Sequence, residues 1–119
     1  MNNGNSAMRG AHSREIQYYR NQNGRAPFTE WLQSIRDPKT ENRILRRLDR
    51  LTRGNFGECK SVGGGVFELI LDFGPGYRIY FSEIRNIVVL LLCGGDKGSQ
   101  LRDIERAKTY WREYMEVNQ

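Results

Sequence analysis

The sequence predicts an α+β fold in which a small antiparallel sheet is packed by an N-terminal helical hairpin and a C-terminal helix. Two helical patterns follow each other before residue 54, with only Asp37-Pro38 between them. Strand-like runs separated by glycine-rich turns then extend to Cys93, and one more amphipathic helix follows. Strands that come in a run after a pair of helices are typical of α+β domains, because βαβ units would alternate the two.

The length and charge of the chain restrict the class of protein. Its 119 residues suit one domain, and 19 Lys and Arg against 14 Asp and Glu give a net charge of +5. The longest apolar run, Ile87 to Cys93, is far shorter than the ~20 residues of a membrane helix. Residues 1–13 are mostly small and polar and contain no export signal, so we expect a flexible extension there, with a solvated His12, before a domain over 14–119. We therefore expect a cytoplasmic protein that makes no membrane contact.

The first elements are a short strand and a helix. Ile16 to Tyr19 are β-prone and precede the polar turn Asn21 to Gly24. Apolar residues then recur at helical spacing after Pro27, from Phe28 to Ile35. Asp37-Pro38 ends this helix, because a residue that precedes proline avoids helical dihedral angles.

The second helix, from about Lys39 to Arg53, has two distinct faces. Its apolar stripe consists of Ile44, Leu48 and Leu51. A second stripe is entirely cationic and consists of Arg43, Arg46, Arg50 and Arg53. Gly54 fits the position after the helix end. A solvated face is the commoner role of such a stripe, and the alternative is electrostatic attraction to nucleic acid or to an acidic protein.

The second half of the chain reads as strands followed by a helix. A glycine turn at 63–65 opens the strand 66–71, and Gly74-Pro75-Gly76 separates it from the strand 77–81. The Val/Leu run 87–93 suits a strand that is covered on both faces. We expect residues 94–98 to form a loop and Ser99 to cap a last helix, whose apolar residues are Ile104, Ala107, Trp111 and Tyr114.

No motif in the chain indicates a metal or another cofactor. Cys59 and Cys93 are far apart and have no histidine partner nearby in the sequence, and Cys93 lies in a strand that we expect to be buried. The glycines at 63–65 lead into a strand and no Lys-Ser/Thr pair follows, so they indicate a hairpin instead of a P-loop. The loop 94–98 joins a strand to a capped helix, and at such a position backbone N–H groups and the Lys97 ammonium are suited to bind a phosphate.

Alternation along two neighbouring strands brings polar side chains to one face of the sheet. Arg78 and Tyr80 share one face of their strand, while Ile79 and Phe81 suit the core. A hairpin through Gly74-Pro75-Gly76 brings the face of Glu68 and Ile70 beside Arg78. Cleavage of RNA by its own 2′-hydroxyl needs a proton acceptor, a proton donor and cations for the phosphorane charge, and these residue types supply that chemistry without histidine.

Several ordered blocks resemble the RelE/ParE toxin superfamily, in its phage-type killer-protein branch near HigB. The main ones are residues 63–69, 74–81 and 91–97, together with Gln100 and Asp103-Ile104, and upstream blocks at 28–32 and 47–58 also match. The resemblance covers about residues 15 to 114. It implies a RelE-like α+β fold and a toxin encoded beside an antitoxin.

The resemblance also implies an activity and its residues. RelE and HigB relatives cleave mRNA on the ribosome, whereas ParE relatives share the fold and poison DNA gyrase. By position, Arg78 matches the phosphate-binding arginine of the superfamily, Lys97 matches a cation after the last strand, and Lys60 is a looser match. Ile70 stands where this branch usually has an arginine, and no His or Tyr stands in the loop after Lys97.

These observations lead to one main hypothesis and several alternatives. We expect the toxin component of a type II toxin–antitoxin system, an mRNA interferase that needs no cofactor. The candidate catalytic residues are Arg78, Lys97, Glu68 and Tyr80, and the candidate RNA-binding residues are Lys60, Arg43, Arg46, Arg50 and Gln100. The alternatives are a ParE-like gyrase inhibitor, a degenerate toxin retained for antitoxin binding, and an RNA-binding domain without toxicity. An acidic segment of a helix-turn-helix antitoxin, encoded adjacently, would lie across the Arg43/Arg46/Arg50 surface or the cleft.

Overall fold

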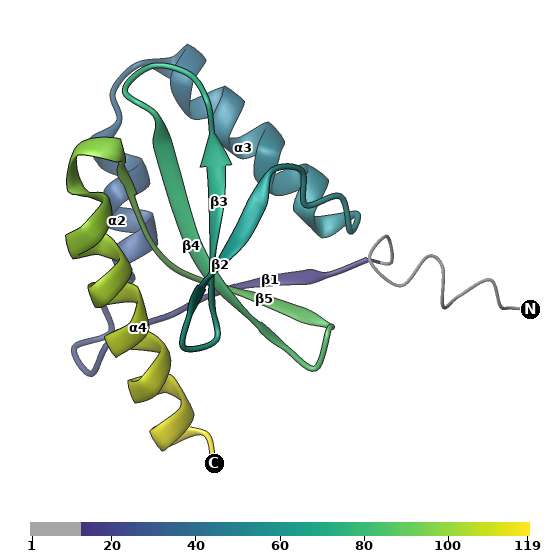
Figure 1. Cartoon of the computed structure of the whole chain (residues 1–119), viewed down its shortest axis with the longest axis vertical. Helices are drawn as coiled ribbons and strands as arrows, with labels where there is room; N and C mark the ends of the chain where they lie inside the picture. Colours follow the sequence, from purple (N-terminus) through teal and green to yellow (C-terminus); the bar gives the residue numbers. More distant parts are fainter. Residues whose placement is uncertain (1–12) are drawn as a thin grey trace, which may run out of the picture.

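The computed structural model describes residues 13–119, which form a five-stranded mixed sheet with helices on both faces (Figure 1). In chain order the elements are β1 (Glu15–Tyr18), α2 (Pro27–Ser34), α3 (Pro38–Thr52), β2 (Cys59–Gly63), β3 (Val66–Leu71), β4 (Tyr77–Ile84), β5 (Val88–Asp96), the 3-10 turn η1 (Lys97–Ser99) and α4 (Gln100–Val117). The predicted α+β class is confirmed. Except for Ser13, the predicted extension over 1–13, including His12, lies outside the described residues.

The strand order of the sheet is β1-β5-β4-β3-β2. Strands β2 to β5 form an antiparallel meander, as expected, but β1 pairs with β5 in parallel, so the prediction of a purely antiparallel sheet was wrong. No short turn connects β1 to β5, because the rest of the sheet and two helices lie between them in sequence. Nothing local to the sequence therefore sets the direction of β1, whereas tight turns force the other pairs to be antiparallel.

The sheet separates two apolar clusters. One contains Phe28 of α2 and Ile44, Leu48 and Leu51 of α3, packed on residues of β3, β4 and β5. The other lies under α4 and includes Val66, Leu92, Cys93 and Ala107. Strand β5 contributes to both clusters, which confirms that its apolar run is covered on both faces.

The helix boundaries follow their predicted signals. Pro27 and Pro38 occupy the first turns of α2 and α3, and the Asp37 side chain accepts hydrogen bonds from Lys39 N and, at 2.8 Å, from Thr40 Oγ1. Gly54, with a φ of 83°, follows the end of α3, where a left-handed conformation is needed.

The expected loop over 94–98 begins later in the structure, because Gly94, Gly95 and Asp96 belong to β5. Glycine is required at the first two positions by close packing on either face. A Cβ on Gly94 would collide with the ring of Trp31 in α2, and one on Gly95 would collide with the carboxylate of Asp103 in α4. These glycines therefore let both helices approach the end of β5 next to the site described below.

Replacing Gly95 by alanine is expected to lower the free energy of unfolding by about 1–3 kcal/mol, the usual cost of overpacking a filled site. Asp103 is buried and its Oδ2 accepts a 2.5 Å hydrogen bond from Ser99 Oγ, so the carboxylate has no free space in which to move. Urea denaturation followed by circular dichroism measures the change. Gly98→Ala is the control, because a Cβ there would meet only Asp96 Oδ1 at 3.2 Å and should cost less. Equal stability of the two variants would contradict this account.

Candidate functional site

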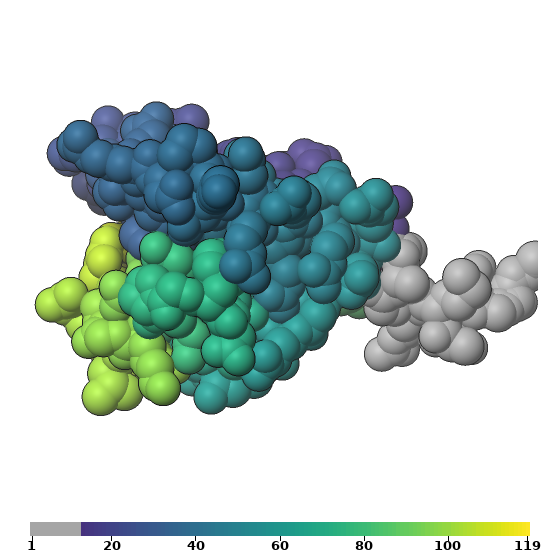
Figure 2. All heavy atoms as spheres, turned by 90° about the horizontal axis from the view of Figure 1, so that it is seen from above, coloured from purple at the N-terminus to yellow at the C-terminus, as the bar shows by residue number. Residues whose placement is uncertain are grey.

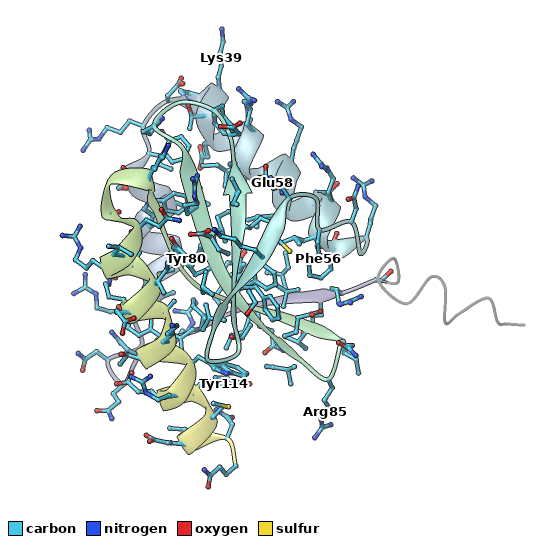
Figure 3. The ribbon with its side chains drawn as sticks, in the orientation of Figure 1. Lys39, Phe56, Glu58, Tyr80, Arg85 and Tyr114 are labelled. Carbon is cyan, nitrogen blue, oxygen red and sulfur yellow. The ribbon has the colours of Figure 1, made fainter. Side chains whose placement is uncertain are left out.

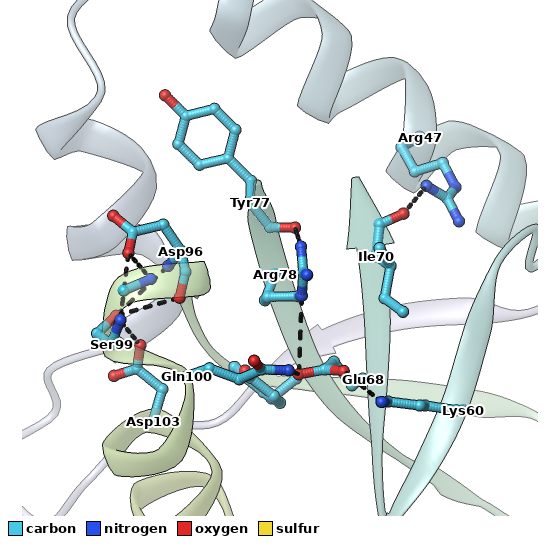
Figure 4. A network of polar contacts seen from close by, with 12 residues as sticks. Arg47, Lys60, Glu68, Ile70, Tyr77, Arg78, Asp96, Ser99, Gln100 and Asp103 are labelled. Atoms are coloured by element: carbon cyan, nitrogen blue, oxygen red, sulfur yellow. Dashed lines mark hydrogen bonds and ion pairs between the residues drawn. The ribbon is translucent and has the colours of Figure 1, made fainter. Parts of the chain in front are cut away.

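A buried carboxylate, Glu68, lies at the centre of the polar cluster on the α4 side of the sheet. Glu68 is 0% exposed. Tyr80 Oη donates a 2.9 Å hydrogen bond to its Oε2, and Gln100 Nε2 donates another at 2.7 Å (Figure 4). The three residues come from β3, β4 and the first turn of α4. The predicted proximity of Glu68 and Tyr80 is confirmed, and α4 adds Gln100 to them.

The strand register brings two cations to the same carboxylate. Lys60 of β2 and Tyr80 of β4 lie directly opposite Glu68, and Arg78 lies opposite Ile70, one step along the same face. Lys60 Nζ is 3.8 Å from Glu68 Oε1, and Arg78 Nε is 3.9 Å from Oε2. The Lys60 side chain is 60% exposed and that of Arg78 is 11% exposed. One face of the sheet therefore presents an exposed cation and a largely buried cation beside one carboxylate.

Lys97 completes the cationic cluster from η1. A Cβ built on Gly76 would lie 3.4 Å from both Arg78 Nη1 and Lys97 Cβ, so the two cationic residues flank this glycine of the β3–β4 turn. Arg78 Nη1 also donates to the Tyr77 carbonyl at 3.1 Å, which fixes the direction of the guanidinium. Lys97 itself is exposed. The predicted grouping of Arg78 with Lys97 is therefore present in the fold.

The backbone at η1 does not offer the free N–H groups that the sequence suggested for phosphate. Asp96 Oδ1 accepts hydrogen bonds from Gly98 N at 2.8 Å and from Ser99 N at 3.3 Å. The chain's own carboxylate thus fills the position where an anion would bind. Ser99 precedes α4, as predicted, but its hydroxyl donates to Asp103 and does not cap the helix backbone.

Two polar atoms of the cluster lack hydrogen-bond partners among residues 13–119. They are Glu68 Oε1 and Arg78 Nε, and both are inaccessible to solvent. Buried polar atoms are normally paired, because an unpaired one costs about 1–3 kcal/mol. One acceptor and one donor at the centre of the site are therefore unpaired in a place that solvent does not reach.

Burial controls the protonation of Tyr80. Removal from water, and then the hydrogen bond to Glu68, raise the pKa of the Tyr80 phenol far above its ordinary value. The phenol therefore stays protonated at neutral pH and acts as a hydrogen-bond donor to Glu68. Tyr80 is 0% exposed, so its contact with Glu68 is shielded from water.

Arg47 is a polar residue of this region that sequence reasoning missed. Its guanidinium donates to the Ile70 carbonyl at 2.7 Å (Figure 4). It also donates to the carbonyls of Phe56 and Glu58 at 3.1 and 3.0 Å. Burial, and then the neighbouring Arg50, lower its pKa. Its position, three residues after Ile44 and four before Leu51, placed it at the edge of the apolar stripe and was the available signal. Arg47 fastens the segment before β2 to the end of β3 and does not replace the arginine that the resemblance implies at Ile70.

The predicted RNA-binding arginines of α3 lie away from this cluster. Arg43, Arg46 and Arg50 are exposed on a helix that packs on the opposite face of the sheet from Glu68. They line a cavity of about 300 Å³ together with Arg47 and residues 71–73. The predicted residues therefore form two separate groups, one around Glu68 and one on α3.

Comparison with known proteins identifies a relative of this chain. No family model matches the sequence. An uncharacterized protein of Haemophilus influenzae is 46% identical over 81 residues, which cover 68% of this chain and 82% of that protein. The chain belongs to the same family as this Haemophilus protein. Because the description of the Haemophilus relative names no activity, the chemistry of the site has to be argued from the residues themselves.

Two further findings concern metals and membranes. Among the described residues, no group of three or more His, Cys, Asp and Glu side chains is placed to hold a metal ion. Within 13–119, no helix combines the length and apolar character needed to cross a bilayer.

Replacing Glu68 by glutamine is expected to lower the free energy of unfolding by about 1–3 kcal/mol, because it leaves Arg78 beside a neutral group in a buried site. Thermal or urea unfolding measures the effect. The matched control is Glu30→Gln, which removes the carboxylate that pairs with Arg25 at 2.6 Å; the two side chains are 46% and 67% exposed, so water compensates for the loss. If Glu68→Gln were as stable as the unaltered protein, the carboxylate would not be the electrostatic centre of the site.

Proposed function

We propose that this protein is the toxin of a type II toxin–antitoxin system and that it cleaves translated mRNA on the ribosome. The observation that carries the proposal is the position of Lys60 and Arg78 beside the buried Glu68, with Lys97 next to Arg78 at Gly76. This cluster has the composition that cleavage of RNA through its 2′-hydroxyl requires without histidine or metal. The resemblance to the RelE/ParE superfamily, near HigB, supports the same assignment, and a RelE-like fold is part of the proposal.

In the proposed reaction the 2′-oxygen forms a bond to phosphorus while the bond from phosphorus to the 5′-oxygen breaks. We assign the proton of the 2′-hydroxyl to Glu68 Oε1, the oxygen without a hydrogen-bond partner among residues 13–119. Because Oε1 is buried, the exposed Lys60 side chain, whose ammonium lies 3.8 Å away, has to move aside when RNA binds. Tyr80 and Gln100 hold the other oxygen and fix the carboxylate, so we assign them a positioning role.

The cations act on the phosphate. Arg78 and Lys97 stabilise the negative charge that develops on the phosphorane oxygens, because donors aimed at developing charge act strongly in a site with little water. Lys60, whose ammonium lies beside Glu68 Oε1, supplies a proton to the departing 5′-oxygen. A cyclic phosphate and a free 5′-hydroxyl result.

Primer extension on mRNA from a translation reaction with the purified protein tests this function. We expect new 5′ ends inside the translated region, and we expect them to require ribosomes. Intact mRNA would overturn the proposal. We also propose that the protein acts in the cytoplasm with a helix-turn-helix antitoxin encoded adjacently, and the neighbouring reading frame shows whether such a protein exists.

One observation favours a second candidate function, binding without RNA cleavage. Ile70 lies opposite Arg78 in the sheet, so one cation that the resemblance implies is missing beside the phosphate position. A ParE-like gyrase inhibitor or a degenerate toxin that only binds its antitoxin would tolerate this loss. A supercoiling assay with purified gyrase separates the candidates, because an mRNA interferase leaves supercoiling unchanged.

A further inference from the structure

A second cationic site lies between α3 and the turn that joins β3 to β4. Four arginines of α3 line one side of a cavity of about 300 Å³, and residues 71–73 line the other. Figure 2 views this end of the molecule, where the β3–β4 turn lies against the blue and teal surface of α3. The sheet separates this cavity from Glu68, so the site is distinct from the cluster described above.

The arginines of the cavity differ in what they already bind. Arg47 is occupied by three backbone carbonyls. Arg46 and Arg50, in contrast, form no ion pair with any carboxylate of residues 13–119. Arg53, the next residue of the same stripe, pairs with Asp49 at 2.5 Å and does not line the cavity. Two exposed guanidinium groups with open donor positions therefore face one concave surface, which favours an anionic ligand.

Arg43 adds a flat surface to this charge. Its guanidinium carbon lies 3.7 Å from the centroid of the Phe73 ring, so the two planar groups are in contact. Arg43 is exposed, and its outer face is open to a second planar group. Nucleobases of unpaired RNA stack on guanidinium planes, and RNA carries such a base and a phosphate on every nucleotide, which fits a stacking surface beside two open cations.

We propose that this α3 cavity binds a segment of single-stranded RNA, with phosphates at Arg46 and Arg50 and a base stacked on Arg43. The inference rests on the proposed function only in taking RNA as the ligand. Asp72, which lies in the same lining, repels phosphate and so directs the RNA backbone towards Arg46 and Arg50. The cavity holds RNA at a distance from the cleavage site and anchors it there.

Fluorescence anisotropy with the full chain, without ribosomes, tests the binding. The probe is a short, labelled, single-stranded RNA with 2′-O-methyl groups, which remove the nucleophile and prevent cleavage. We expect Arg46→Glu/Arg50→Glu to weaken binding at least tenfold. Loss of two phosphate contacts should also flatten the slope of log K against log salt concentration by about 1.4. Arg53→Glu reverses a charge on the same helix and should have a much smaller effect; an effect as large as that of the double variant would overturn the proposal.

Charge-conserving variants test the stacked base. Arg43→Lys keeps the charge but loses the plane, so binding should weaken about tenfold with an unchanged salt slope. Arg46→Lys keeps a phosphate-binding charge and should bind nearly as well as the unaltered protein. Equal effects of the two substitutions would exclude stacking on Arg43. Circular dichroism confirms that each variant is folded before its binding is measured.

The outcomes separate this inference from the proposed function. If the protein cleaves mRNA but the α3 variants bind the RNA probe unchanged, the inference is wrong and the function stands. If the protein does not cleave mRNA but binding depends on Arg43, Arg46 and Arg50, the function is wrong and the inference stands. The same variants are also tested for binding of a labelled glutamate-rich peptide. If they lose the peptide but bind RNA unchanged, the cavity is a peptide site and the inference is overturned.

Discussion

Replacing Arg78 by alanine is expected to reduce ribosome-dependent mRNA cleavage by about 10²–10³-fold, the usual cost of removing one donor from a site that stabilises developing negative charge. The side chain is only 11% exposed and is held by the Tyr77 carbonyl, so its position is set before substrate arrives. Its Nε is buried 3.9 Å from Glu68 Oε2, so we expect the outer nitrogens of the guanidinium to contact the phosphate. Quantitative primer extension at a fixed time measures the loss of cleavage.

The matched control for this experiment is Arg85→Ala. Arg85 is an exposed arginine at the tip of the β4–β5 turn, and Figure 3 shows it pointing away from the sheet, far from Tyr80. Its φ is 56°, and alanine keeps a Cβ at this position, so the substitution removes the charge and leaves the backbone strain of the turn similar. Cleavage should stay near the level of the unaltered protein. A similar loss in both variants would indicate that overall charge matters and that Arg78 has no specific role.

The part of the site that lies in the meander was predictable from the sequence. The turn at Gly74-Pro75-Gly76 joins two alternating strands, and alternation then decides which residues share a face. The apolar residues Ile79 and Phe81 had to face the core, which left Arg78 and Tyr80 beside Glu68. Local turn chemistry and burial were sufficient, because no distant contact was needed to fix the register.

Features that depend on contacts distant in sequence were not predictable. Gly94 and Gly95 read as a loop, but they continue β5 because they pair with Ile79 and Arg78 of β4. Glycine is needed there because Trp31 and Asp103 pack where their side chains would be. The turn between β4 and β5 contains no glycine, and Arg85 and Asn86 both adopt positive φ there. The carbonyls that Arg47 binds are brought to it by the fold, and sequence spacing does not reveal them.

The α3 arginines show how far charge alone can be interpreted. The stripe predicted an exposed cationic face, and the structure confirms that Arg43, Arg46, Arg50 and Arg53 are exposed. The four arginines differ in their contacts, because Arg53 is paired with Asp49 and Arg43 lies on Phe73. A helical pattern identifies which residues share a face. Their partners come from other parts of the chain and decide which of them is available to a ligand.

A buried thiol should make the protein lose stability at alkaline pH. Removal from water is the main reason that the pKa of Cys93 rises from 9.0 to about 12. Between these values the unfolded chain releases a proton that the folded chain retains, so the free energy of unfolding falls as pH rises. The loss is about 1.4 kcal/mol per pH unit, or about 4 kcal/mol by pH 12. The pKa values of Tyr19 and Tyr80 are raised as well, mainly by burial, and add to the loss above their ordinary value of 10.0.

Cysteine variants isolate this contribution. Urea denaturation under reducing conditions at pH 8 and pH 10 should show that the unaltered protein loses about 1.4 kcal/mol more than Cys93→Ala does. Cys93→Ala is less stable at both pH values because it leaves a space in the cluster under α4, but the difference between the two pH values is the measured quantity. Cys59→Ala is the control: Cys59 is only half-buried, so the variant should keep most of the alkaline loss. If Cys93→Ala were as sensitive to pH as Cys59→Ala, the thiol would not be held protonated by the sheet. Water would then reach Cys93 between β5 and α4, the helix that places Gln100 on Glu68.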